Sequence, residues 1–168
     1  MAYGTSTESA SQYTTARLVM QKTMAMIRTA RLHDAYDPDN GALTLVMPSS
    51  PDHPLHSVGL QMQQPDGHIA RIWWADDSDE DGQALGSLWF SVDDGDPQQL
   101  ITHVVAQLDD DDAPYVFTLA SRTSDEGLLL ERATLDLELE RGAAAATEIE
   151  AAGRLGGLHL IGSTVPRR

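Results

Sequence analysis

Two spacings of hydrophobic residues divide the chain. From an N-cap at Thr14 or Thr15 to about His33, apolar residues recur every three or four positions, which is typical of an amphipathic α-helix. After Asn40-Gly41, a dipeptide that favours tight turns, apolar and polar residues alternate in short stretches bounded by Gly, Pro and Asp. The pattern therefore predicts an N-terminal helix followed by antiparallel strands.

The alternating stretches define the expected strands. The clearest is 127–140, where Leu135, Leu137 and Leu139 alternate with acidic residues and so give one buried and one solvated face. The apolar segment 155–161 is expected to form a last strand or a docking segment. The other expected strands cover 42–47, 57–63, 68–75, 85–92 and 114–122.

Two further helices complete the expected fold. Aspartates before Pro97 suit the positive end of a helix dipole, so we expect a helix over 97–108. An alanine-rich segment, 142–152, predicts a short helix near the C-terminus. The expected fold class is α+β, with a mainly antiparallel sheet of about five to six strands in meander and hairpin connections. The N-terminal amphipathic helix, the middle helix and the short C-terminal helix would pack on this sheet.

The chain length indicates one domain. With 168 residues, 41% of them hydrophobic and 22% charged, the chain can bury one aliphatic core. We expect a flexible polar arm over 1–13, a single α+β domain over 14–162 and a basic tail over 163–168.

Several classes of protein are excluded or disfavoured by what the sequence lacks. It has no cysteine, which excludes disulfides, thiolate metal sites and a cysteine nucleophile. It has no apolar run of about 18 residues, and its N-terminus does not resemble a signal peptide. We therefore expect a cytoplasmic or virion- or particle-associated protein that is not secreted by a signal peptide and does not contact a membrane.

The net charge of −15 comes from 26 acidic and 11 basic residues, with Lys22 as the single lysine. A halophilic surface and a GC-rich genome are both open explanations of this composition. Direct binding of nucleic acid is disfavoured, because such proteins need patches of Lys and Arg. The distribution is also uneven: residues 1–33 carry +3, residues 34–126 carry −17 and residues 127–168 carry −1. The basic N-terminal element could pack on its own acidic body or on that of a neighbouring copy.

The known sequence patterns of catalysis are absent. The chain has no Gly-x-Ser-x-Gly, no Ser-x-x-Lys and no His-Glu-x-x-His, and no glycine-rich phosphate loop opens a helix. Asp52, His53 and His56 lie close together, but their spacing matches no zinc pattern. We expect a protein that is not an enzyme, with no catalytic residue and no cofactor.

One acidic segment partly matches a calcium-binding loop. Asp77, Asp79 and Asp81 have the spacing of the first three ligands and precede a glycine. Leu88 stands where the bidentate glutamate is required. A solvated acidic loop is the favoured interpretation, and the three aspartates are a weak candidate for cation binding.

The interface candidates lie on the first helix and on two strands. Three helix residues share an apolar face that could adapt to a protein partner or pack on the protein's own sheet, with a basic residue beside it. Two adjacent tryptophans must point to opposite faces of their strand, so one of them could anchor an interface, unless a helix covers each face. The candidates are Met20, Met24, Ile27, Arg28, Trp73, Trp74 and Trp89.

Three functions are compatible with these features. The first is a non-catalytic, acidic protein-binding module, adaptor or chaperone-like and homo-oligomeric. The second is a structural subunit of a larger assembly, such as a virus tail, a head–tail connector or an injection particle. The third is a nucleic-acid mimic, because aspartates cluster in runs such as 109–112. In each case the partner is a protein or further copies of this chain.

Overall fold

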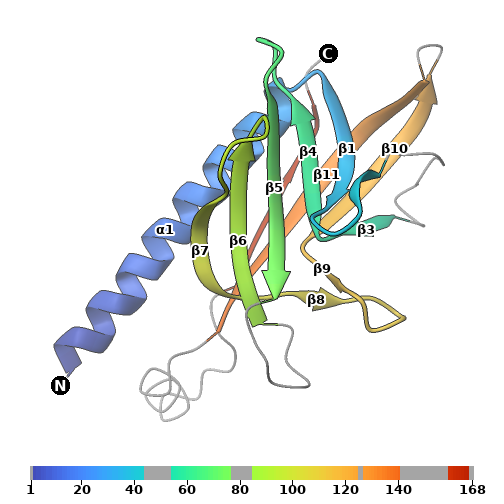
Figure 1. Cartoon of the computed structure of the whole chain (residues 1–168). Coiled ribbons are helices and arrows are strands. Elements are labelled where there is room, and N and C mark those ends of the chain that lie inside the picture. Colours follow the sequence, from blue (N-terminus) through green and yellow to red (C-terminus); the bar gives the residue numbers. More distant parts are fainter. Residues whose placement is uncertain (1, 44–53, 77–84, 125–126, 141–158, 167–168) are drawn as a thin grey trace.

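A computed structural model describes residues 2–43, 54–76, 85–124, 127–140 and 159–166 (Figure 1). The described residues form one helix and twelve strands. The helix is α1 (Ala2–Thr29). The strands are β1 (Leu32–Asp37), β2 (Gly41–Leu43), β3 (Leu55–Ser57), β4 (Gly59–Gln63), β5 (Ile69–Asp76), β6 (Leu85–Val92), β7 (Gln98–Val105), β8 (Gln107–Leu108), β9 (Pro114–Tyr115), β10 (Phe117–Ser124), β11 (Gly127–Leu139) and β12 (His159–Thr164).

Ten of the strands form one curled antiparallel sheet, shaped as a half-barrel (Figure 1). Its order is β2-β1-β4-β5-β6-β7-β11-β10-β3, and β12 pairs with β11 beside this path. Strands β8 and β9 form a separate two-stranded ribbon. The curl gives the sheet an inner face, which holds the core, and an outer face.

One bent segment, 55–63, joins distant parts of the sheet. Its first part, β3, pairs with β10, whereas its second part, β4, pairs with both β1 and β5. At the bend the Ser57 hydroxyl donates a hydrogen bond to Gly59 O over 2.6 Å. A Cβ on Gly59 would lie 2.7 Å from Tyr36 O and 2.8 Å from Trp73 Cβ, so only glycine fits between the two neighbouring strands.

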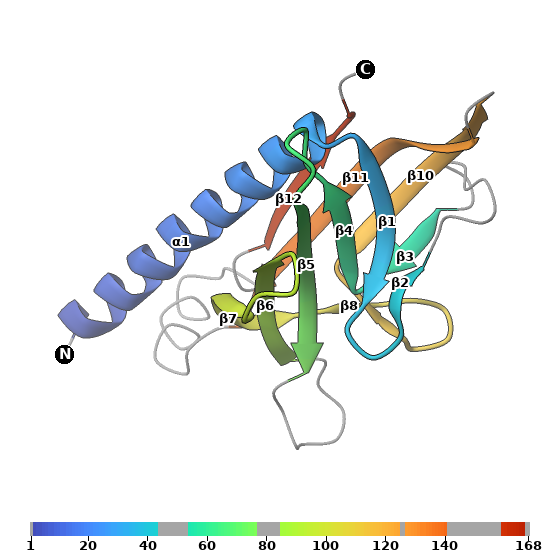
Figure 2. The same cartoon turned by 45° about the horizontal axis from the view of Figure 1, so that its top comes forward.

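Helix α1 runs along β7, β11 and β12 (Figures 1 and 2). Its buried residues lie three and four positions apart, as one helical face requires, and they join the core that lines the inner side of the sheet. At the C-terminal end of the helix, His33 Nε2 donates a hydrogen bond of 2.8 Å to Ile27 O. The largest fully buried side chains of the core include Ile27, Leu60, Met62, Ile72, Leu88, Phe117, Leu119, Leu135 and Leu137.

The expected α+β fold with three helices is wrong. The protein is mostly β, with ten strands in its large sheet where five to six were expected and one helix among the described residues. The expected helix 142–152 lies outside the described residues. The expected helix 97–108 is instead strand β7 followed by β8.

The error at 97–108 has a physical cause. Ile101 and Val104 are both buried although they lie three positions apart, a spacing that a regular strand would place on opposite faces. His103 between them has a φ of +60°, and the pairing of β7 with β6 shifts register in this region. A strand with such irregularities reproduces the spacing of a helix.

Other boundaries also differ from the expected ones. Helix α1 begins at Ala2 rather than after Thr14 or Thr15, so the backbone of residues 2–13 is helical. Strand β1 was not expected, and the strand expected over 42–47 is described only as β2. The expected hairpin of 114–122 and 127–140 is confirmed by β10 and β11, and the expected last strand by β12, although it begins at His159. The division into arm, domain and tail stays a prediction.

No helix in the described part of the chain is both long enough and apolar enough to cross a membrane.

Candidate protein-binding face

The candidate site lies on the outer face of the half-barrel. The strand register aligns Tyr36 on β1, Gly59 on β4, Trp73 on β5, Trp89 on β6 and Gln99 on β7. Directly opposed residues of neighbouring strands share one face of a sheet. We call Tyr36, Trp73 and Trp89 the aromatic row.

The aromatic row is closely packed. The rings of Tyr36 and Trp73 meet edge to face, with centroids 5.6 Å apart and planes at 64°. Gly59, which lies between them in the register, has no side chain to separate the two rings. Trp73 is only 7% exposed, whereas Tyr36 and Trp89 are half-buried. Two partly accessible rings therefore lie on either side of a buried one.

Polar side chains border the aromatic row, and one of them holds the Arg71 guanidinium over the Tyr36 ring. Arg71 Nε donates a hydrogen bond of 2.8 Å to Gln61 Oε1, and the guanidinium carbon lies 5.3 Å from the centroid of the Tyr36 ring. Gln99 Nε2 donates to Ser87 Oγ over 2.9 Å. Asp34 lies on the same face, two residues before Tyr36 on β1 and opposite Gln61 of β4. Burial raises the pKa of its carboxyl.

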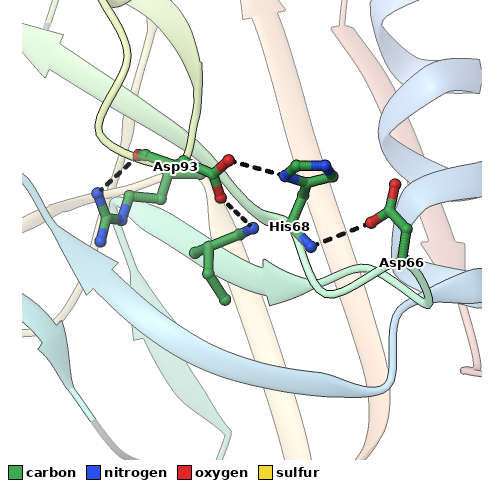
Figure 3. Close-up of polar contacts among 5 residues, drawn as sticks. Asp66, His68 and Asp93 are labelled. Carbon is green, nitrogen blue, oxygen red and sulfur yellow. Dashed lines mark hydrogen bonds and ion pairs between the residues drawn. The ribbon is translucent and has the colours of Figure 1, made fainter.

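An ion pair ties the turn after β4 to the turn after β6 at the end of this face (Figure 3). His68 Nδ1 donates to Asp93 Oδ2 over 2.8 Å, and Ile69 N donates to Asp93 Oδ1 over 3.0 Å. Asp66 Oδ1 accepts a hydrogen bond of 3.0 Å from His68 N. Arg71 Nη1 donates to Asp93 O over 3.3 Å. Asp93 itself has a φ of +53°, so the chain turns here instead of beginning a helix.

The pKa values of the two partners of this ion pair are shifted in opposite directions. The hydrogen bond to Asp93, with the charges of Asp66 and Asp93, raises the pKa of His68. The Ile69 amide and then the His68 ring lower the pKa of Asp93. Both side chains are more than half exposed, so solvent screens their attraction. The pair therefore positions two turns and contributes little to global stability.

The predicted tryptophans lie on both faces of the sheet. Trp73 and Trp89 are direct cross-strand partners on the outer face. Trp74 points to the inner face, is 4% exposed, and donates from Nε1 to Val104 O over 3.0 Å. The structure thus brings together two of the three tryptophans predicted as interface candidates and places the third in the core.

The three apolar candidates on the helix pack within the chain. Met24 and Ile27 are buried in the core, and Met20 packs against Gly162 of β12. Arg28 is exposed. Of the two interpretations of this apolar helix face, packing on the protein's own sheet is the arrangement observed.

The candidate cation residues Asp77, Asp79 and Asp81 lie outside the described residues, as do Asp52 and His53. Within the ranges that the structure describes, no three His, Asp or Glu side chains are grouped closely enough to hold a metal ion. His56 stacks on the ring of Tyr115, with centroids 3.9 Å apart.

The sequence could have identified part of the outer face. Arg71 lies two residues before Trp73, so strand alternation alone places it beside the aromatic row. Tyr36 was missed because β1 was not predicted. Gln99 was missed because β7 was expected to be a helix.

Comparisons of the chain with protein-family models, with curated proteins and with solved structures found no significant match. The outer face must therefore be interpreted from its own chemistry.

Proposed function

We propose that the protein is a non-catalytic binding module whose outer sheet face receives a protein partner. The observation that carries this proposal is the cross-strand pair of Trp73 and Trp89 on the outer face, with Tyr36 against Trp73. Tryptophan, tyrosine and arginine are the residues most enriched at the energetic centres of protein interfaces. Arg71, held over Tyr36, adds the third of these types to the same surface.

The composition of this face favours a protein over other ligands. The neutral amides Gln61 and Gln99 flank the rings and can exchange hydrogen bonds with a peptide backbone. A nucleic acid would require a basic surface, but Arg71 is the only lysine or arginine among 34–121, and the whole chain carries −15. These features support recognition of a protein.

The acidic runs behind the mimic hypothesis have local roles in the described structure. In 109–112, Asp109 Oδ1 accepts hydrogen bonds from Asp111 N and Ala113 N over 2.8 and 2.9 Å. The run that begins at Asp93 fixes His68 and the backbone of Ile69. Turn formation accounts for Asp109 and Asp93, the first residue of each run, so we do not favour the mimic.

The test is affinity capture from the source organism with the full chain. A variant carrying Tyr36→Ser and Trp89→Ser alters only half-buried members of the aromatic row. The matched control, Leu108→Ser, removes an apolar side chain that is 52% exposed on β8, outside this face. We expect a protein that the wild type and the control capture and the double variant does not.

Any captured protein is then purified and titrated against each variant. The proposal requires an affinity at least about tenfold weaker for the double variant, which corresponds to about 1.4 kcal/mol. Equal affinities for the double variant and the wild type would overturn it, because the aromatic row would then contribute nothing to binding.

A further inference from the structure

The exposed face of α1 is a second surface that the fold leaves uncovered. Residues on the opposite side of the helix are buried against the sheet, whereas this side faces away from it (Figures 1 and 2). Leu18 lies on this side and is 56% exposed. The exposed residues of this face are Thr14, Arg17, Leu18, Gln21, Lys22, Ala25, Arg28 and Thr29.

Among the residues that the structure describes, the cations on this face have no acidic partner. No carboxylate in the described part of the chain forms an ion pair with Arg17, Lys22 or Arg28. The Arg17 guanidinium lies 5.7 Å from the centroid of the Tyr13 ring, and that ring is itself exposed. In a protein of net charge −15, three cations on one helix face without an ion pair to any described carboxylate form an unusual surface.

The complementary charge lies elsewhere on the molecule. Residues 34–126 contain nineteen acidic and two basic residues. Among the described acids, Asp110, Asp111 and Asp112 are exposed in the turn that joins β8 to β9. Both views place this turn on the side of the molecule away from α1 (Figures 1 and 2). The turn therefore cannot neutralise the helix of its own chain.

We propose that the exposed face of α1 binds the acidic body of a second copy of this chain, at the turn between β8 and β9. Two α1 helices would bring Arg17, Lys22 and Arg28 against the same cations of the neighbour, and like charges in an interface oppose association. The acidic turn provides the opposite charge. Because the two surfaces differ and lie on opposite sides, the contact is head-to-tail and generates rings or filaments.

The charges also determine how salt should act on this contact. At low ionic strength the whole-molecule charge of −15 repels a second copy over a long range. At about 0.15 M salt the screening length falls to about 8 Å, so the facing surfaces dominate, and near 1 M it is about 3 Å and their attraction is lost as well. Association should therefore be strongest at intermediate salt.

A charge-swap experiment on the full chain tests the proposal. One variant carries Arg17→Glu, Lys22→Glu and Arg28→Glu, and the other carries Asp110→Lys and Asp111→Lys. Asp109 is kept because it accepts the amides of the turn, and Asp112 because its φ is +60°. Sedimentation velocity at several salt concentrations measures the mass of each variant alone and of the two mixed. Arg132→Glu, at an exposed position on β11, is the control for added negative charge.

The wild type and Arg132→Glu should self-associate, each swapped variant alone should stay monomeric, and the mixture should associate again. Restoration in the mixture also shows that both variants are folded. A wild type that is monomeric at every salt concentration would overturn the proposal. So would a helix variant that associates as the wild type does, or a mixture that stays monomeric while the wild type associates.

Discussion

Trp74 reaches Val104 across an intervening strand. Its indole Nε1 on β5 donates a hydrogen bond of 3.0 Å to the carbonyl oxygen of Val104 on β7, and β6 lies between them. Gly86 of β6 makes this possible, because a Cβ there would lie 2.8 Å from Trp74 Cε2 and 2.0 Å from Ala75 O. Because Gly86 has no side chain, the indole ring of Trp74 can occupy the space beside its Cα.

Gly86→Ala should destabilise the protein. The added methyl would meet the backbone of Ala75, which cannot move without disturbing the pairing of β5 with β6. We expect the free energy of unfolding to fall by about 1–3 kcal/mol, as measured by urea denaturation. Gln98→Ala, at an exposed position of β7, is the control and should be near neutral. Equal stability of the two variants would contradict this account of Gly86.

Trp74→Phe should cost stability through the lost hydrogen bond. The substitution keeps an aromatic ring in the core but leaves the buried Val104 carbonyl without this donor, which costs about 1–3 kcal/mol of unfolding free energy. Trp73→Phe is the matched control, because Trp73 is similarly buried and its indole nitrogen makes no hydrogen bond among the described residues. If both variants lost the same stability, the hydrogen bond would not be the cause.

Met20 and Gly162 should be energetically coupled. A Cβ on Gly162 would lie 2.2 Å from Met20 Sδ, so Gly162→Ala displaces the methionine and with it the contact between α1 and β12. In the Met20→Ala background the new methyl has space. A double-mutant cycle should therefore give a coupling energy of about 0.5–3 kcal/mol, with Gly162→Ala less harmful in that background. Simple additivity would mean that the helix shifts to accommodate the methyl.

The His68–Asp93 ion pair should hold its two turns together only in a window of pH. The pKa of His68 is raised above 6.5, so its contribution is full below that pH and is lost as the pH rises through the folded value. The pKa of Asp93 is lowered below 3.8, so its contribution is full above 3.8 and is lost as the pH falls through the folded value. The ion pair is therefore fully formed between about pH 4 and 6.5.

NMR titration of the His68 ring measures this directly. Asp93→Asn should bring the pKa of His68 down towards its ordinary value. Asp96→Asn, in the same exposed turn, is the control for loss of one charge. An unchanged His68 titration in Asp93→Asn would show that the pair does not form in solution.

Asp34→Asn should stabilise the protein at neutral pH. Burial raises the pKa of Asp34, so the folded state disfavours the carboxylate, and this penalty is full above the folded pKa and disappears as the pH falls to about 3.8. The amide carries no charge and avoids the penalty. Thermal unfolding at pH 7 and pH 4 should show a gain at the higher pH only, and Asp39→Asn at an exposed turn should show neither. A gain of equal size at both pH values would point to a cause other than charge.

Local sequence patterns predicted regular elements well and irregular ones poorly. The alternation of Leu135, Leu137 and Leu139 correctly predicted β11, because that strand buries one face and exposes the other. The same logic failed at β7, where a positive φ at His103 lets Ile101 and Val104 share the inner face. The acidic turn at Asp93 resembled a helix N-terminus because its aspartates precede Pro97, but Asp93 instead accepts the amide of Ile69 on another strand.

The candidate site was predictable only in part for the same reason. Trp73 and Trp89 are recognisable as strand residues, but their side-by-side position depends on the register of β5 and β6. Tyr36 joins them from a strand with few apolar residues, whose pairing with β4 is specified by distant parts of the chain. Strand register and sheet order are properties of the assembled sheet, so a single sequence window does not contain them.

The bend at 55–63 has a consequence for how the sheet can come apart. A fluctuation that separates β3 from β10 also pulls on Gly59, which is held tightly between β1 and β5. We therefore expect that separation of β3 from β10 disturbs β4 as well, rather than remaining confined to β3. We also expect the amide protons of β3, β4, β5 and β10 to exchange in one cooperative opening event.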